Sequence, residues 1–267
     1  MKLVSLNVAV FEKNNPQLSG FFLKNKFDFV CLQEVTKRVD NEVSEDYLSK
    51  NPIDDSTKEL KYSFFGPLWI KKGFSMKNFH GKEKFEFSYG GNIEFGNYVK
   101  SKYKIYKGQN IFVQNHFTYV TDWSYWPEED HRAVQVVDIL ISANKKLRLL
   151  NYHGIWTQHK QGNDLAYKAC KKIEKLALEV DYPSIICGDF NLFPETPSIK
   201  LFDENFINLP NKYNIMTTRP PTNELHGKER NVVDYIFISK GVKVNSFEVL
   251  DSDVSDHLPL LLDFDLV

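Results

Sequence analysis

Several short apolar runs, each bounded by polar or turn residues, constrain the fold of this chain more than any other feature. Runs of this length between turn signals indicate buried strands. The predicted strands cover residues 3–8, 29–33, 134–142, 147–153, 184–187, 235–239 and 258–264. The sequence therefore predicts a core that is built mainly from β-sheet.

Only a few segments have the pattern of a helix. The clearest covers residues 163–180, where apolar residues recur near helical spacing and Asn163 or Asp164 can cap the start. A short helix is expected over residues 16–25, and another begins at Thr196-Pro197. Many strands with few helices predict helices that cover a sheet-rich core. We find no internal repeat or linker, and we expect one domain over residues 1–267.

Charge and cysteine content narrow the class of protein. The net charge of -1 and the pI near 6.7 differ from the basic balance of a dedicated duplex-binding module. A metal site would nevertheless concentrate carboxylates, so a basic substrate path beside it would not show in the net charge. The cysteines are Cys31, Cys170 and Cys187, which lie among apolar neighbours and match no zinc spacing, so buried free thiols in a reducing compartment are expected.

The N-terminus is a poor signal peptide, and no stretch approaches the roughly 20 apolar residues of a membrane span. We therefore expect a soluble cytoplasmic monomer with no membrane span and no obligate protein partner, unless a leader has been removed.

Residues with amide, carboxylate or imidazole side chains recur where the predicted strands begin or end. They are Asn7, Glu34, His153, Asp189, Asn191, Asp234, Asp256 and His257. Oxygen ligands suit a hard cation such as Mg²⁺, for which Mn²⁺ substitutes, and the lack of a Cys or paired-His set argues against zinc. Such a set can neutralise a phosphoryl group, aim a water and stabilise a leaving oxygen. These residues predict metal-dependent cleavage of a phosphoric ester.

The motifs that hold these residues resemble one superfamily. In order they are Leu-Asn7, Leu-Gln-Glu34, Asn151-Tyr-His153, Gly-Asp189-Phe-Asn191, Asp234-Tyr-Ile-Phe and Ser-Asp256-His257. Together they resemble the endonuclease/exonuclease/phosphatase (deoxyribonuclease I-like) superfamily, from residue 3 to about residue 264. The histidine at position 153 favours its deoxyribonuclease, sphingomyelinase and tyrosyl-DNA phosphodiesterase 2 side. The resemblance implies an α/β fold, a four-layer sandwich of two packed, mainly antiparallel sheets flanked by helices.

The resemblance also implies separate roles for these residues. Glu34 would be the principal metal ligand, with Asn7 and Asp256 beside the metal or the phosphate. Asp189 would position or deprotonate the attacking water, and Asn191 would orient that water or a phosphate oxygen. His153 would contact the scissile phosphate or protonate the leaving group. Asp234 would orient His257, whose imidazolium would stabilise the transition state.

Substrate contacts are predicted for Asn97, Arg132, Trp123 and Trp126. Arg132 could bind a phosphate or only an acidic neighbour such as Glu128 or Asp130. Residues 70–91 and 116–132 have no regular pattern. The first mixes lysines with aromatic residues, which either stack bases and follow a nucleic-acid backbone or form a surface hairpin. The second, around Trp123 and Trp126, could hold a base, a lipid chain or a peptide, or pack onto the core.

Three functions follow from these features. The first is a nuclease or DNA-end-processing phosphodiesterase with nucleic acid as substrate, which would act in DNA repair. The second is a phosphoesterase for a lipid headgroup or a soluble phosphate, similar to sphingomyelinases or inositol phosphatases. The third is a binding protein without activity, since function depends on the site and not on the scaffold.

Overall fold

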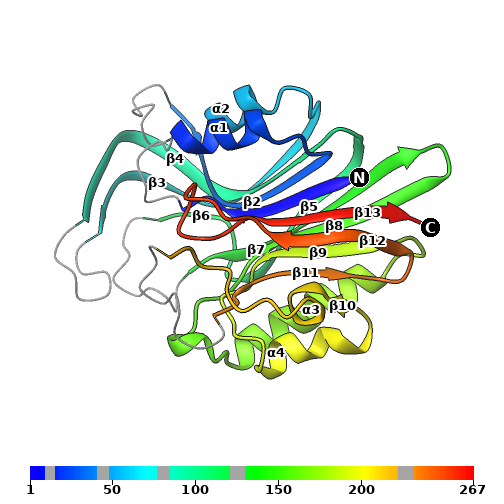
Figure 1. Cartoon of the computed structure of the whole chain (residues 1–267). Coiled ribbons are helices and arrows are strands. Elements are labelled where there is room, and N and C mark those ends of the chain that lie inside the picture. Colours follow the sequence, from blue (N-terminus) through cyan, green and yellow to red (C-terminus); the bar gives the residue numbers. More distant parts are fainter. Residues whose placement is uncertain (10–15, 41–47, 77–84, 121–129, 222–230) are drawn as a thin grey trace.

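The computed structural model describes residues 1–9, 16–40, 48–76, 85–120, 130–221 and 231–267. The strands of this part of the chain form two sheets (Figure 1). The first sheet has the order β12-β13-β1-β2-β4-β3-β6. Its strands are β1 (Lys2–Asn7), β2 (Phe29–Arg38), β3 (Tyr62–Met76), β4 (Phe85–Ser101), β6 (Thr118–Tyr119), β12 (Val242–Val249) and β13 (Leu260–Leu266).

The second sheet has the order β10-β11-β9-β8-β7-β5. Its strands are β5 (Lys104–Gln114), β7 (Arg132–Ser142), β8 (Lys145–His153), β9 (Ser184–Asp189), β10 (Ile207–Asn208) and β11 (Asp234–Ile238). Parallel pairs occur only at β1/β2, β3/β6 and β8/β9 among the described strands. The prediction of two mainly antiparallel sheets is therefore confirmed.

Successive residues of the central strands point into different layers. On β1, Leu3 packs between the two sheets, whereas Val4 and Leu6 pack on the outer side. On β9, Cys187 faces the gap between the sheets and Ile186 faces the other way. These strands are buried on both faces, which explains why they appear in the sequence as continuous apolar runs.

Helices cover the outer face of each sheet (Figure 1). The helices α1 (Pro16–Lys24) and α2 (Lys50–Ser56) lie over the first sheet, where Phe22 and Ile53 join its outer apolar cluster. Over the second sheet lie α3 (Asp164–Leu178) and α4 (Pro197–Lys200), followed by η3 (Leu201–Glu204). The short helix α5 (Leu209–Lys212) contributes Leu209 to the apolar cluster between the sheets. The described elements thus form the four layers that the family resemblance implied.

The predicted elements occur in the structure with shifted ends. All seven predicted strands are present, although β2 continues to Arg38 and β13 begins at Leu260. Asn163 caps α3, since its side-chain oxygen accepts a hydrogen bond from the Ala166 amide at 2.9 Å. Thr196 precedes α4 but does not cap it, because its hydroxyl donates to the Phe193 carbonyl at 2.8 Å.

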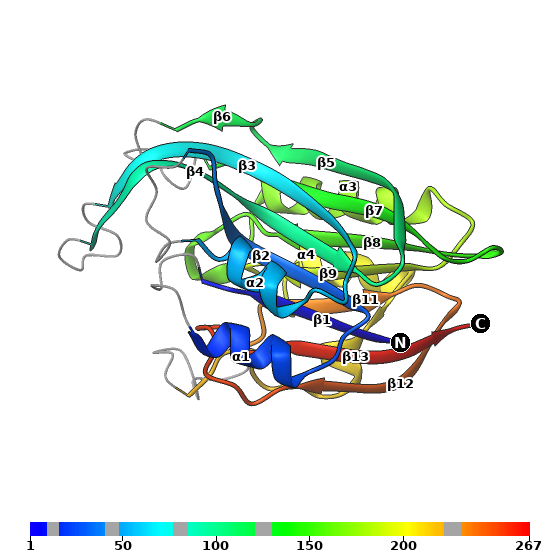
Figure 2. The ribbon, with the colours of Figure 1, turned by 90° about the horizontal axis from the view of Figure 1, so that it is seen from above.

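The hairpin alternative for residues 70–91 is confirmed for the backbone of the described part, which forms paired strands and is not irregular. Residues 70–76 belong to β3 and residues 85–91 to β4, and the two strands form a long hairpin that continues past the rest of the sheet (Figure 2). The segment lacks strict alternation of apolar residues, so its strands depend on pairing with each other. Residues 77–84 and 121–129 lie outside the described residues, and Trp123 and Trp126 with them.

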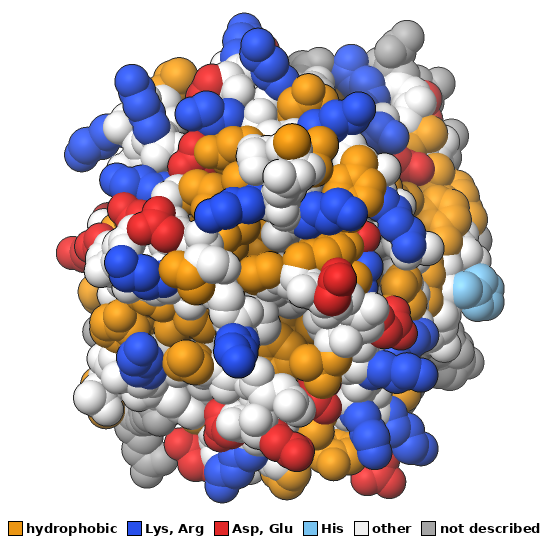
Figure 3. All heavy atoms as spheres, turned by 90° about the vertical axis from the view of Figure 1, so that its right-hand side faces the viewer, with side chains coloured by type: hydrophobic (Ala, Val, Ile, Leu, Met, Phe, Trp, Pro, Cys, Tyr) orange, Lys and Arg blue, Asp and Glu red, His pale blue; other side chains and the backbone are white. Residues whose placement is uncertain are grey.

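None of the described helices is long and apolar enough to span a membrane. Figure 3 shows the end of the molecule where both termini lie, with lysine and arginine side chains interspersed among acidic and apolar ones. The polar motif residues lie at the opposite end of the sheets.

Candidate active site

Strand direction brings the motif residues of the first sheet together. The parallel strands β1 and β2 pair with Asn7 opposite Gln33, and Glu34 follows Gln33. Parallel strands end at the same edge of a sheet, so Asn7 and Glu34 meet there. Glu34 lies at a break in the β2/β4 register and has a φ of +61°, a conformation that a non-glycine residue rarely adopts.

The motif residues of the second sheet lie at the same end of the molecule as Asn7 and Glu34. His153 at the end of β8 lies opposite Asp189 at the end of the parallel strand β9. The antiparallel strand β11 begins with Asp234, which also lies opposite Asp189. Asp189 is thus flanked by a histidine on one neighbouring strand and a carboxylate on the other.

A glycine makes this close arrangement possible. Gly188 precedes Asp189 and has a φ of +137°, and a Cβ at this position would lie 1.9 Å from the Tyr152 carbonyl oxygen. Only glycine can therefore occupy it without displacing β8. This is the physical reason for the glycine of the Gly-Asp189-Phe-Asn191 motif.

The Asn7 amide joins the two sheets at the site. Its Nδ2 donates to Glu34 Oε1 at 3.0 Å and to Asp189 Oδ2 at 3.1 Å. Its Oδ1 accepts from the Ala9 amide at 3.0 Å, which fixes the orientation of the side chain. Asn7 therefore holds two carboxylate oxygens beside each other.

His257 lies between two carboxylates. Its Nδ1 lies 2.9 and 3.0 Å from the two oxygens of Asp234, and its Nε2 lies 3.5 Å from Asp189 Oδ2. Burial and Arg219 oppose the charge on His257, but Asp234, Asp189 and Asp256 outweigh them and raise the pKa of the imidazole. Burial also opposes ionisation of Asp189, yet the charge of His257 above all holds the pKa of this carboxyl below its ordinary value. The site thus favours an imidazolium beside a carboxylate.

His153 has the opposite electrostatic character. Burial, reinforced by the charge of Arg132, lowers the pKa of its imidazole well below the ordinary value. Arg132 Nη1 lies 2.7 Å from His153 Nδ1, and Arg132 Nη2 lies 2.6 Å from Asp130 Oδ2. His153 Nε2 lies 3.5 Å from Glu34 Oε1 and 3.8 Å from Asp189 Oδ2. His153 is therefore a neutral imidazole at neutral pH.

Two cations at the site were not singled out in the sequence. The Lys160 ammonium donates a short hydrogen bond to Asn191 Oδ1, and Arg219 Nη1 donates to Asp256 at 3.2 Å (carbonyl) and 3.1 Å (Oδ2). Burial lowers the pKa of Lys160 to about 8. Each residue lies in a loop without periodic pattern, so no spacing in the sequence marks it.

A family profile covers all of these residues. The profile, described as the Endonuclease/Exonuclease/phosphatase family, matches residues 4–257. The chain belongs to this family. The match confirms the resemblance that the six motifs carry.

Solved structures of this family share the fold at low sequence identity. An endonuclease/exonuclease/phosphatase from Beutenbergia cavernae DSM 12333 is 17% identical with a TM-score of 0.68, covering 100% of this chain and 71% of the other. A mannosyl-6-phosphatase from Bacteroides thetaiotaomicron VPI-5482 is 14% identical with a TM-score of 0.65, covering 100% of both. Humanized D. rerio TDP2 is 13% identical with a TM-score of 0.66, covering 99% and 98%. A comparison with curated protein sequences finds no match.

Two sets of side chains at the endonuclease/exonuclease/phosphatase site of this chain could hold a metal ion. Asp189, Asp234 and His257 offer ligand atoms that all lie within 4.8 Å of one another. In that set, both Asp234 oxygens already contact His257 Nδ1. Glu34 Oε1 and Asp189 Oδ2, which share the Asn7 amide, form the second set. Carboxylate oxygens are the donors that Mg²⁺ prefers, so these residues fit the ion.

Asp256 and the predicted substrate residues lie in different environments. The Asp256 side chain is 46% exposed at the rim, with Oδ1 3.9 Å from His257 Nε2. Arg132 is buried against Asp130 and His153. Asn97 is fully buried between the sheets, where Nδ2 donates to the Ala133 carbonyl at 3.2 Å. The substrate contacts of Asn97 and Arg132 stay predictions.

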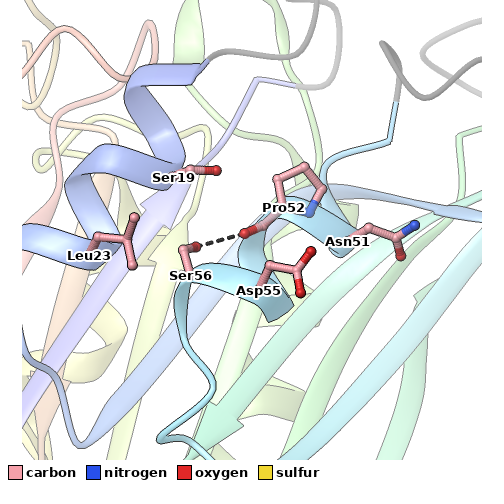
Figure 4. A pocket seen from close by; sticks show the side chains of 6 residues that line it. All are labelled: Ser19, Leu23, Asn51, Pro52, Asp55 and Ser56. Carbon is pink, nitrogen blue, oxygen red and sulfur yellow. Dashed lines mark hydrogen bonds between the residues drawn. The ribbon is translucent and has the colours of Figure 1, made fainter.

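A separate pocket lies outside this endonuclease/exonuclease/phosphatase site, between α1 and α2 (Figure 4). It is lined by Ser19, Leu23, Asn51, Pro52, Asp55 and Ser56. It contains none of the motif residues.

Proposed function

We propose that the chain is a Mg²⁺-dependent phosphodiesterase that hydrolyses nucleic acid or a nucleic-acid end by in-line attack of water on phosphorus. One observation carries the chemistry: Asp189 lies between the Asp234–His257 pair and the Asn7–Glu34 pair. An acceptor for water and a donor for phosphoryl oxygen therefore lie side by side.

Glu34 and Asp189 would hold the ion, with Asp256 beside it. When bound, Mg²⁺ supplies positive charge that neutralises phosphoryl oxygens, and Mn²⁺ would substitute. The Asn7 amide keeps the two carboxylates together.

Asp189 accepts a hydrogen bond from the attacking water and aims it at phosphorus. Its lowered pKa keeps it ionised at neutral pH, which makes it a constant acceptor. Its Oδ1 also accepts from the Asn191 amide at 2.8 Å, and this contact limits rotation of the carboxylate. As the water oxygen bonds to phosphorus, the proton of the water leaves through this carboxylate and the ester P–O bond breaks.

The two histidines take different parts in this reaction. His257, with its raised pKa, carries a proton that it can donate to the leaving oxygen, and Asp234 stabilises its charge. His153 is neutral, and a neutral imidazole does not readily release its remaining proton. It would donate a hydrogen bond from Nε2 to a phosphoryl oxygen.

The assignment of nucleic acid as the substrate is supported by residues 70–91, whose sequence mixes lysines with aromatic residues and lies partly outside the described residues. The solved structure named as a mannosyl-6-phosphatase shares the fold, which supports a soluble phosphomonoester as the alternative substrate. A phospholipid headgroup is the other alternative. The cysteines are free and buried, which supports the further proposal of a reducing, cytoplasmic location.

A substrate panel tests the proposal. Purified protein would be assayed with Mg²⁺ or Mn²⁺ on single-stranded DNA, duplex DNA, RNA, a tyrosyl-phosphate diester, a sugar phosphate and sphingomyelin vesicles. We expect turnover of a nucleic-acid phosphodiester that Asp189→Asn abolishes and Asp181→Asn, an exposed control, leaves unchanged. Turnover confined to the sugar phosphate or the vesicles would replace the substrate assignment. No turnover on any substrate would remove the proposed function.

A further inference from the structure

Lys160 occupies an unusual place in the loop between β8 and α3. It ends the 3-10 turn η2 (Gln158–Lys160), seven residues after His153 in the sequence. Its ammonium donates to Asn191 Oδ1 and lies 5.5 Å from the centre of the Trp156 ring. The backbone amide of Asn191 in turn donates a hydrogen bond to Asp189 Oδ1. Asn191 therefore connects Lys160 to the carboxylate that is proposed to bind water.

The backbone holds Lys160 in this position. His159 and Lys160 have φ values of +56° and +57°, which cost each residue about 1 kcal/mol or more. The Lys160 amide donates to the Thr157 carbonyl at 3.0 Å, and its carbonyl accepts from the Phe193 amide at 3.0 Å. The second of these bonds ties the loop to the segment that follows Asn191. Strain of this kind is concentrated at functional sites.

The Lys160 ammonium forms no direct salt bridge in the described part of the chain, and Asp189 and Asp234 act on its charge only from a distance. Its close contacts are an amide oxygen and an aromatic ring, both electrically neutral. Burial lowers the pKa of the ammonium to about 8, as expected for a cation that lacks full hydration. A negatively charged ligand would compensate this charge.

We propose that Lys160 binds a non-bridging oxygen of the scissile phosphoryl group and that Asn191 positions its ammonium for this contact. The proposal rests on the proposed function, because it places the phosphoryl group beside Asp189. Asn191 then accepts a hydrogen bond from the Lys160 ammonium with Oδ1, while its Nδ2 donates to the Gly154 carbonyl at 3.3 Å. Lys160 is thus a catalytic residue in the sense that it touches the substrate.

Three variants test this assignment. Lys160→Met removes the charge, Lys160→Arg keeps it, and Lys168→Met removes an exposed charge from α3. Two measurements are made on each variant: kcat/KM on the best substrate, and the rise in melting temperature produced by inorganic phosphate. We expect Lys160→Met to lower kcat/KM by about 10- to 100-fold, as for loss of a charge-assisted hydrogen bond. The phosphate-induced rise should shrink with it, Lys160→Arg should restore part of both, and Lys168→Met should match wild type.

Two results would overturn the assignment while the wild type remains active. In one, Lys160→Met behaves like Lys168→Met. In the other, Lys160→Met and Lys160→Arg lose activity equally and keep the full response to phosphate, which would show that Lys160 only supports the loop. If the wild type has no activity on any substrate, the proposed function fails instead, and the phosphate response still reports on Lys160.

Discussion

Arg132 Nη1 lies 2.7 Å from His153 Nδ1. A guanidinium can only donate, so Nδ1 must accept, and the single proton of the neutral imidazole is on Nε2. That nitrogen faces Glu34 and Asp189 at 3.5 and 3.8 Å. Arg132 therefore sets both the tautomer of His153 and the direction of its hydrogen bond.

From this contact we expect Arg132→Met to lower kcat by about 10- to 100-fold, the usual effect of removing a group that orients a site residue. Arg148→Met is the matched control, because Arg148 forms a buried pair with Asp138 at 2.7 Å on the same two strands, β8 and β7. Steady-state kinetics and melting temperature would be measured on both. If the two variants lost stability and activity in the same proportion, Arg132 would have no specific role in orienting His153.

Asp234→Asn should change the pH dependence of the reaction. In the proposed mechanism His257 acts in its protonated form, so activity falls as pH rises through its pKa. Asp234 helps to raise that pKa, and its loss should move the alkaline limb of the kcat profile to lower pH. At pH 8 the variant should be slower by about 100-fold. An alkaline limb at the wild-type position would show that His257 is not the group that titrates, and His257→Ala should lack the limb.

Removal of the Glu34 carboxylate should weaken metal binding. Because Glu34 Oε1 and Asp189 Oδ2 share the Asn7 amide, loss of one charge leaves the other carboxylate to hold the ion. We expect Glu34→Gln to require at least about tenfold more Mg²⁺ for half-maximal activity. The same shift should appear in the Mg²⁺ dependence of the melting temperature, which needs no turnover. Glu179→Gln, at the exposed end of α3, should bind Mg²⁺ as wild type does, and an equal response from both variants would exclude Glu34 as a ligand.

A buried amide network behind the site should contribute to stability. Asn151 Oδ1 accepts from Gln33 Nε2 at 2.6 Å, and its Nδ2 donates to Gln135 Oε1 at 3.0 Å. All three side chains are fully buried; Gln33 belongs to the first sheet, and Asn151 and Gln135 belong to the second. Asn151→Leu removes both contacts, leaves Gln33 Nε2 with only a 3.4 Å contact to the Cys31 carbonyl, and should lower the free energy of unfolding by about 2 to 4 kcal/mol.

Denaturant titration measures this loss, and the exposed Asn205→Leu, which removes a 2.9 Å bond to Glu174, should cost less than about 0.5 kcal/mol. In a cycle with Gln135→Leu, the double variant should lose less than the sum of the single losses. Strict additivity would mean that the network does not act as a unit.

The sequence alone determined the strands that carry the site and the identity of its central residues. β1, β2, β8 and β9 are buried on both faces, so their apolar runs are continuous and their polar end residues are conspicuous. Residue order and motif spacing then predicted the family, which the profile over residues 4–257 confirmed. These are local properties, and hydrophobic patterning reports local properties well.

The tertiary structure alone decided which side chains contact one another. Asn7 and Asp189 are 182 positions apart, and their 3.1 Å contact depends on the packing of two sheets. The sequence left the hairpin over residues 70–91 as one of two alternatives, and the pairing of β3 with β4 decided between them. The contact of Arg132 with His153 and the placement of Lys160 on Asn191 have no periodic signal, because each depends on a partner that is remote in sequence or on a strained loop. The charges of the site residues follow from the same contacts, which no run of residues encodes. Burial and the charge of Arg132 keep His153 neutral, whereas neighbouring carboxylates favour the charge on His257 against the effect of burial.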